Sequence, residues 1–380
     1  MKVSLIRTAA AAVLMLAVPA LPAMAQAPFK VGISAGLTGY AATVDTAWRD
    51  GVEVAVAALN AKGGLLGRKV EVVVEDNHSE PQQAVTAYRK MISSDKVDVF
   101  VSGCVSAGNF AAAPMVVKAE IPMVLCSILP NQPDQVKWAF TTIPPPRFEV
   151  EKRLEYLRNN TQIRKFGVLH DPTPYSNLQA SVAEKEQGDY GLAMVTSEQY
   201  EQNDSDLSVQ IAKINAAGGG AILKIGLGGS TLTAAKNIQQ LGLNLLMLTS
   251  LEDVAVFRPV AQVMGDKFFF VASPSQVYDA LPESPLKAAI AAFLEPWRAK
   301  YGDRDPNWAA RGWDAVALVT AAAKAANSTT GPALRDEIEK LKGFQGTTGV
   351  YNMSAENHYG LTQNPLFLAQ IIDGKTRVAK

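Results

Sequence analysis

The sequence predicts an α/β fold of two lobes, each a parallel sheet flanked by helices. Short apolar runs alternate with amphipathic stretches almost throughout the chain, and this alternation is typical of a parallel sheet covered on both faces. The alternation restarts after the stiff, Pro-rich segment TTIPPP at 141–146. A length of 380 residues is enough for about two domains, each with its own core.

The first residues have the pattern of an export signal. Lys2 and Arg7 precede an apolar run at 9–20, and Ala23-Met24-Ala25 fits the small-x-small cleavage rule, which predicts Gln26 as the mature start. The apolar run is too short to span a bilayer. No cysteine stands at the cleavage point to carry a lipid. We therefore expect a soluble protein in the periplasm.

The first half of the chain contains four apolar runs that read as buried strands, at 31–35, 70–75, 97–102 and 123–126. Helices are expected between them, at 46–60, 79–93 and 107–119. Ser79-Glu80-Pro81-Gln82 has the pattern of a capping box with proline in the first helical turn.

The second half repeats this layout without repeating the sequence. Strands are expected at 166–170, 194–200, 221–226, 245–249 and 268–272, with helices at 175–186, 206–216, 231–241 and 254–263. Three further helices follow at 285–301, 308–326 and 332–341, and two strands at 349–353 and 366–373. A second crossing between the lobes is expected at Ser273-Pro274-Ser275.

Charge and composition exclude several classes of protein. The 36 basic and 36 acidic residues balance and form no basic cluster, which argues against nucleic acid and anionic membrane surfaces as partners. His78, His170 and His358 lie far apart, so no metal site is expected. Cys104 and Cys126 both fall at expected strand ends, where either a disulfide or two buried thiols would fit.

The catalytic and cofactor motifs of the chain are weak. Gly32, Gly36 and Gly39 lie in and after the first strand but lack the G-x-G-x-x-G spacing of a dinucleotide site. No serine stands in a nucleophile elbow and no triad order is evident. We therefore expect no cofactor, no catalytic residue and no enzyme activity.

Seven segments carry a family resemblance. They are GLTGYAA (36–42), NAKGGLLGRKVEVVVEDN (60–77), PQQAV (81–85), PMVLCS (122–127), WRAKYG (297–302), RGWDAVALVTAAAKAA (311–326) and FQGTTGVYNM (344–353). In this order they resemble the branched-chain amino-acid (leucine/isoleucine/valine-type) periplasmic binding proteins of bacterial ABC importers. The resemblance implies two Rossmann-like lobes joined by three hinge crossings, the type I periplasmic binding protein fold, with ligand bound between the lobes.

The lobe boundaries follow from the resemblance and the expected crossings. We expect a signal peptide at 1–25 and an N-terminal lobe made of 26–142 and 274–348. The C-terminal lobe would combine 143–273 with 349–380.

One loop is a candidate carboxylate site. The segment 103–109 runs from a strand end to a helix N-terminus, where ligands of α/β sheets lie and where free N–H groups favour an anion. We expect the hydroxyl of Ser106 and the N–H groups of Ala107 and Gly108 to bind a carboxylate, although an ordinary N-cap would use the same residues. Ser127 resembles the second carboxylate contact of the family, but Ile128 and Leu129 depart from the Ser-Ala-Thr that the family often has there.

Four other residues resemble cleft positions of the family. Tyr40 and Tyr175 would enclose a side chain while keeping a polar group. Gly228 belongs to a second helix N-terminus that faces the cleft. Glu252 stands where amino-acid-binding members bind the ligand ammonium, although it could equally stabilise its own helix.

These expectations favour a periplasmic substrate-binding subunit of an ABC importer. It would capture a small amino acid or an apolar or aromatic carboxylate by hinge closure, act as a monomer, and deliver ligand to an inner-membrane permease. A periplasmic ligand sensor of the same fold is the alternative. A secreted hydrolase would need a nucleophile–base pair in the cleft, and the sequence offers none.

Overall fold

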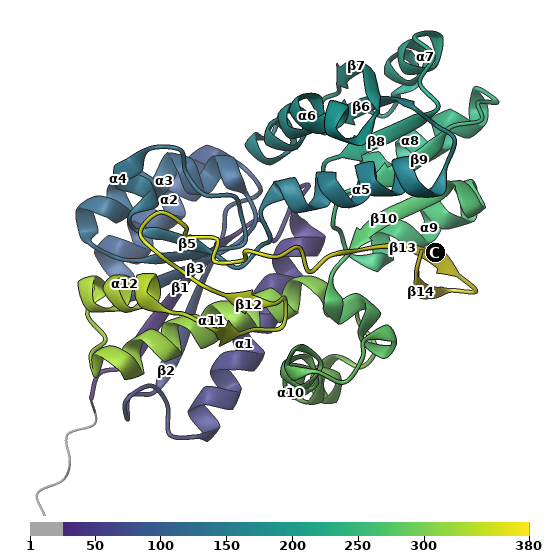
Figure 1. Ribbon diagram of the computed structural model, residues 1–380. Helices are drawn as coiled ribbons and strands as arrows, with labels where there is room; N and C mark the ends of the chain where they lie inside the picture. Colours follow the sequence, from purple (N-terminus) through teal and green to yellow (C-terminus); the bar gives the residue numbers. More distant parts are fainter. Residues whose placement is uncertain (1–25, 380) are drawn as a thin grey trace, which may run out of the picture.

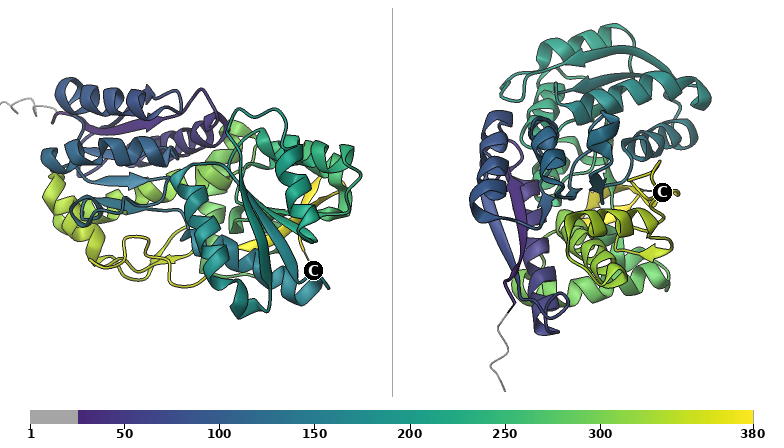
Figure 2. Two further views of the ribbon diagram at one scale, coloured as in Figure 1. Left: turned by 90° about the horizontal axis from the view of Figure 1, so that it is seen from above. Right: turned by 90° about the vertical axis from the view of Figure 1, so that its left-hand side faces the viewer.

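Two α/β lobes lie side by side in the computed structural model, which describes residues 26–379 (Figure 1). The expected signal peptide falls outside the described residues. Each lobe is built around its own sheet, and views from two further directions show the helices packed against the sheets (Figure 2). The predicted fold class is confirmed.

The first lobe contains a five-stranded parallel sheet with the strand order β2-β1-β3-β4-β5. Its strands are β1 (Phe29–Ala35), β2 (Val70–Asp76), β3 (Val99–Ser102), β4 (Met123–Leu125) and β5 (Ala139–Thr141). The helices near it are α1 (Ala42–Ala61), α2 (Pro81–Lys90), α3 (Ser106–Ala119), α4 (Pro133–Val136), α10 (Pro285–Tyr301), α11 (Asn307–Ala326) and α12 (Gly331–Lys340).

Alternating residues of this sheet pack against different helices. Val99 and Val101 belong to the core that includes Trp48 of α1 and Leu318 of α11. Phe100, between the two valines, packs with residues of α2 and α3 on the other side. The period of two along the strand therefore places α1 and α11 on one face and α2 and α3 on the opposite face.

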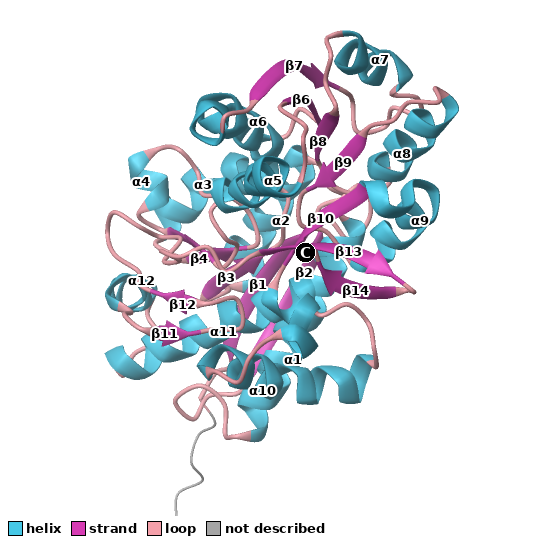
Figure 3. Ribbon diagram, turned by 45° about the vertical axis from the view of Figure 1, so that its right-hand side comes forward, coloured by secondary structure: helices cyan, strands magenta, loops and turns pink. Residues whose placement is uncertain are grey.

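The second lobe contains a seven-stranded sheet with the strand order β14-β13-β10-β9-β8-β6-β7 (Figure 3). Its strands are β6 (Lys165–His170), β7 (Ala193–Gln199), β8 (Ala221–Ile225), β9 (Leu246–Thr249), β10 (Phe268–Ala272), β13 (Phe367–Ile372) and β14 (Lys375–Val378). Its helices are α5 (Pro146–Asn160), α6 (Pro174–Glu186), α7 (Ser208–Ala216), α8 (Ser230–Gln240) and α9 (Val254–Met264).

The chain passes between the two sheets three times: after β5, after β10, and between β12 (Val350–Tyr351) and β13. β12 pairs with β11 (Phe344–Gln345) in a small separate sheet. Two of the passages touch, because the Tyr351 hydroxyl donates to the carbonyl oxygen of Thr142 at 3.0 Å. The expected lobe boundaries stay a prediction.

Several features differ from expectation. Strands β5, β11 and β14 and helices α4 and α5 were not expected. In α5, buried Glu149 and Arg153 interrupt the apolar face. β13 and β14 are antiparallel to their neighbours and form an edge hairpin on the otherwise parallel sheet. The capping box is wrong: Glu80 is the N-cap of α2, and Ser79 Oγ instead donates to the carbonyl oxygen of Thr38 at 2.7 Å.

Helices α1 and α11 cross with almost no space between their backbones. A Cβ atom on Gly51 would lie 2.0 Å from the carbonyl oxygen of Ala309, and one on Gly312 would lie 2.5 Å from the carbonyl oxygen of Trp48. Only glycine allows this approach, and it brings together helices that are far apart in the sequence.

Three buried carboxyl groups give the fold a pH dependence. Burial raises the pKa of Asp45 and of Glu252 to about 7 and the pKa of Asp314 to about 6. In the unfolded chain such groups titrate near pH 4. Between about pH 4 and pH 7 the folded state therefore binds more protons than the unfolded state, and the free energy of unfolding falls as the pH rises.

We expect the protein to gain on the order of 2 kcal/mol of stability when the pH is lowered from about 7.5 to about 5. Urea unfolding at the two pH values measures the difference. Asp45→Asn removes one of the titrating groups and should reduce the pH dependence. A free energy of unfolding that is constant or increases with pH over this range would contradict the expectation.

Candidate ligand-binding site

A cavity lies between the two lobes, at the carboxyl ends of the strands of both sheets. The space between its lining atoms, open solvent included, is about 440 Å³. Its lining residues are Tyr40, Cys104, Ser106, Cys126, Ser127, Ile143, Asp171, Thr173, Tyr175, Ser176, Gly226, Leu227 and Trp308. Most of them follow strands β1, β3, β4 and β5 of the first lobe or β6 and β8 of the second, which is where α/β sheets bind ligands.

The first-lobe wall contains a helix N-terminus without a side-chain cap. Ser106 is the first residue of α3, it is buried, and no side chain caps this helix. By contrast, α6 in the opposite wall is capped by Thr173, which accepts from the N–H of Ser176. The N-terminus of α3 therefore offers the cavity a hydroxyl and uncapped N–H groups, and an anion suits both.

A disulfide bond is part of the first-lobe wall of the cavity. Cys104 and Cys126 are bonded, with their Cα atoms 4.5 Å apart, which decides between the two alternatives left open by the sequence. Asp45 Oδ1 accepts from the N–H of Cys104 at 2.5 Å, and Oδ2 accepts from the N–H of Gly36 at 2.6 Å. The buried carboxylate of Asp45 thus connects the loop after β1 to the disulfide. Because both sulfurs are used in the bond, Asp45 and the two cysteines are no metal site.

Ser127 lies beside this bridge and is held in place by polar contacts. Its Oγ donates to the carbonyl oxygen of Ile128 at 3.1 Å and accepts from Asn109 Nδ2 at 2.9 Å. Asn109 in turn accepts from the Tyr88 hydroxyl at 2.8 Å. Ser127 is therefore a fixed element of the first-lobe wall.

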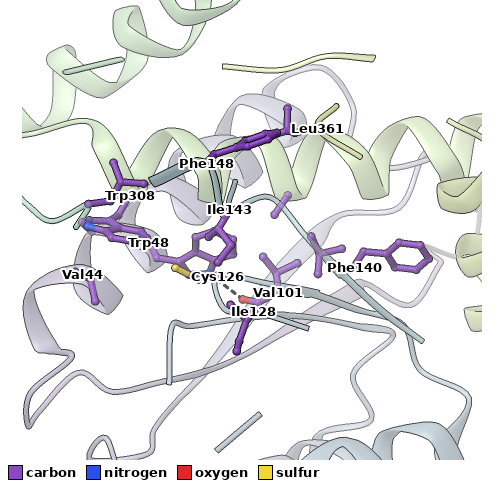
Figure 4. Close-up of a cluster of buried hydrophobic side chains, with 14 of the residues drawn as sticks. Val44, Trp48, Val101, Cys126, Ile128, Phe140, Ile143, Phe148, Trp308 and Leu361 are labelled. Carbon is purple, nitrogen blue, oxygen red and sulfur yellow. Dashed lines mark hydrogen bonds between the residues drawn. The ribbon is translucent and has the colours of Figure 1, made fainter. Parts of the chain in front are cut away.

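Apolar side chains form the part of the cavity nearest the crossings. Cys126, Ile143 and Trp308 line it and belong to the same core cluster, where Figure 4 shows them gathered with Trp48. Trp308 belongs to α11, which begins at Asn307. These groups suit an apolar ligand body.

Tyr175 is held by a buried carboxylate behind it. Its hydroxyl donates to Glu149 Oε1, and Glu149 Oε2 accepts from the N–H of Leu251 at 2.7 Å. Burial, followed by the charge of Glu149, raises the pKa of Tyr175. Its hydroxyl is therefore engaged inside the protein, and its ring is left for contact with a ligand.

The second-lobe wall is the polar one. Asp171 follows β6, and its Oδ1 accepts from the N–H and the hydroxyl of Thr173 at 3.0 and 2.6 Å. It is the one charged residue among the lining residues of the cavity.

The eight expected site residues fall into two groups. Tyr40, Ser106, Ser127 and Tyr175 line the cavity, whereas Ala107, Gly108, Gly228 and Glu252 are not among its lining residues. The binding role of each stays a prediction.

The second group has other contacts in the structure. A Cβ atom on Gly108 would lie 2.7 Å from the Cβ of Ala84, so this glycine allows α2 and α3 to pack closely. A Cβ atom on Gly228 would lie 3.1 Å from the carbonyl oxygen of Tyr40, which places Gly228 at a contact between the lobes. Glu252 is buried, and its carboxylate accepts from the N–H groups of Gly228 and Asp253, both at 2.9 Å.

Several lining residues were not expected from the sequence. Asp171 could have been found, because it directly follows an expected strand in the loop that supplies Tyr175. Trp308 gave no local signal, since a tryptophan in the first turn of an amphipathic helix reads as core.

Comparisons with known proteins show the family and the fold of the chain. A sequence profile of the family described as "Periplasmic binding protein" matches residues 28–376. Among curated proteins, a Leu/Ile/Val-binding protein homolog of Brucella abortus is 28% identical over 195 residues. That match covers 50% of this chain and 52% of the relative, so the chain spans about half the length of this relative.

Two solved structures show the same fold. The branched-chain amino acid transporter substrate-binding protein of Streptococcus pneumoniae, in complex with isoleucine, has a TM-score of 0.76 at 22% identity over 92% of this chain and 98% of the other. A solute-binding protein of an ABC transporter from Rhodopseudomonas palustris, in complex with benzoate, has a TM-score of 0.79 at 20% identity over 92% and 95% of the two chains.

Proposed function

The chain belongs to the periplasmic binding protein family, and on this premise we propose that it is the substrate-binding subunit of an ABC importer. It would capture a small ligand with a carboxylate and an apolar body in the periplasm and deliver it to an inner-membrane permease. Among the described residues, no helix combines the length and apolar character needed to cross a bilayer.

The uncapped N-terminus of α3 is the observation that carries this proposal. It places the Ser106 hydroxyl at a cavity that is otherwise largely apolar on the first-lobe side, and no side chain caps the first N–H groups of this helix. A carboxylate there would be favoured by the helix dipole and by charge-assisted hydrogen bonds. Ser127, two residues beyond β4, would be the second hydroxyl in reach of the ligand.

The ligands of similar proteins support the same ligand chemistry. Isoleucine and benzoate, bound by the two proteins of the same fold, both combine a carboxylate with an apolar body. Tyr40, Ile143 and Trp308 offer this chain's cavity a comparable apolar surface.

Hinge closure would follow from a site shared by two lobes. Ser106 and Ser127 come from the first lobe, while Asp171 and Tyr175 come from the second. A ligand that contacts both walls binds the closed state better than the open state, and so shifts the population towards closure.

A thermal-shift screen tests the proposal. Amino acids and their deaminated acids would be compared at millimolar concentration, because a ligand at about 100 times its Kd stabilises the folded state by about 2.7 kcal/mol. We expect at least one carboxylate-bearing compound to raise the melting temperature. If none does, the proposed ligand class is wrong.

We expect Ser106→Ala to weaken binding of the compound found in the screen by about ten-fold or more, because a charge-assisted hydrogen bond contributes roughly 1.5–3 kcal/mol. Isothermal calorimetry measures the loss. Ser94→Ala, on an exposed segment away from the cavity, is the matched control and should bind like the wild type. Equal affinity of Ser106→Ala and the control would refute the carboxylate site.

A further inference from the structure

We propose that Asp171 binds the ammonium group of the ligand, so that the site selects α-amino acids over carboxylic acids without an amine. This inference rests on the proposed function and names its substrate class.

Asp171 presents one free carboxylate oxygen at the cavity. The residue is 2% exposed, and Oδ1 is occupied by the two hydrogen bonds from Thr173. Among the described residues, none donates a hydrogen bond to Oδ2, although Asp171 lines the cavity. A buried carboxylate oxygen without a donor is costly, and a ligand cation would remove that cost.

Gly226 keeps this oxygen uncovered. A Cβ atom on Gly226 would lie 2.5 Å from Asp171 Oδ2 and 2.3 Å from the Tyr200 hydroxyl, and the glycine has a φ of +123° that L-residues rarely adopt. Gly226 also lines the cavity. The strand end after β8 thus leaves open the space directly beside the carboxylate, where any side chain would collide with it.

The nearest buried cation does not neutralise Asp171 by direct contact. Lys224 Nζ donates to Ser230 Oγ at 2.7 Å and to the carbonyl oxygen of Gly226 at 3.2 Å. Among the described residues, Lys224 forms no ion pair with Asp171 within 4.0 Å. The carboxylate therefore remains available to a second cation that enters through the cavity.

The two walls match the two charges of an α-amino acid. The uncapped N-terminus of α3 with Ser106 lies in the first-lobe wall, and Asp171 lies in the second-lobe wall. A zwitterion that places its carboxylate at the first and its ammonium at the second would contact both lobes. Its side chain would then lie among Tyr40, Ile143 and Trp308.

Glu252, the residue expected from the family resemblance, is less suited to this role in the structure. Each of its carboxylate oxygens already accepts a backbone N–H, from Gly228 and from Asp253, and it is not among the lining residues of the cavity. Assigning the ammonium site to Asp171 or to Glu252 therefore predicts opposite results for the same measurement.

The test uses four matched pairs and three proteins. L-leucine, L-valine, L-phenylalanine and L-alanine are compared by calorimetry with 4-methylpentanoate, 3-methylbutanoate, 3-phenylpropanoate and propanoate. The proteins are the wild type, Asp171→Asn and Glu252→Gln. We expect the wild type to bind one amino acid about ten-fold or more tightly than its deaminated acid. Asp171→Asn should remove most of that preference, by weakening the amino acid and not the acid, while Glu252→Gln should keep it.

The outcomes separate the inference from the proposed function. Wild-type binding of a deaminated acid as tightly as its amino acid would overturn the inference alone, and this measurement needs no variant to fold. A folded Asp171→Asn protein that keeps the preference, or a Glu252→Gln protein that loses it, would also overturn the inference. Failure of all eight compounds to bind would overturn the proposed ligand class and the inference together.

Discussion

Removal of the Cys104–Cys126 disulfide is expected to lower the free energy of unfolding by about 3 kcal/mol. The bond closes a loop between residues 22 apart in sequence, and breaking it returns conformational freedom to the unfolded chain. A double variant, Cys104→Ala with Cys126→Ala, avoids leaving buried thiols behind. Urea unfolding of the variant and the wild type measures the difference.

Reducing agent provides the control for this prediction. It should destabilise the wild type by a similar amount and leave the double variant unchanged. Removing the disulfide should also disturb the ligand site, because both cysteines line the cavity. Affinity for the screened ligand should therefore fall. If full reduction, shown by two titratable thiols, leaves stability unaltered, the bridge has no stabilising role.

Gly51→Ala is expected to destabilise the protein by about 3 kcal/mol or to prevent folding, since overpacking a tight contact costs 1–3 kcal/mol and sometimes more. The new methyl group would lie 2.0 Å from the carbonyl oxygen of Ala309, and a backbone atom cannot move away without shifting α11. Equilibrium unfolding in urea measures the change.

Gly188→Ala is the matched control for this substitution. A Cβ atom there would have nothing within 4 Å, and its φ lies outside the range that disfavours L-residues. This change should leave the stability within about 0.5 kcal/mol of the wild type. Similar stabilities of the two variants would mean that α1 and α11 can separate freely, contrary to the structure.

Much of the fold could be predicted from the sequence, because strands buried on both faces are continuous apolar runs bounded by turn residues. Helix α10 occupies Pro285–Tyr301, as expected. Helix α5 was missed because its buried face includes Glu149 and Arg153. Most polar contacts of these charged side chains are with groups from other elements, such as Gln179 and the N–H of Leu251, which local periodicity does not reveal.

The site was predicted in part for a related reason. Ser106, Ser127, Tyr40 and Tyr175 follow strand ends or open the next helix, and a parallel sheet brings its carboxyl ends to one edge. Resemblance placed Glu252 in the cleft but could not show that backbone N–H groups occupy both its oxygens. No local pattern could bring Trp308 to the cavity, since its position depends on how α11 packs on α1.

The close crossing of α1 and α11 also makes the first lobe depend on a late segment of the chain. The five strands of the first sheet lie within Phe29–Thr141, yet α11, which helps to cover one face of that sheet, begins only at Asn307. In contrast, β6 to β10 of the second sheet and helices α5 to α9 form one uninterrupted stretch of chain. Contacts across long sequence separations form slowly, because loop closure must precede them. The first lobe therefore cannot be completed until α11 has been synthesised, and before that its apolar sheet face is exposed to solvent and to other chains.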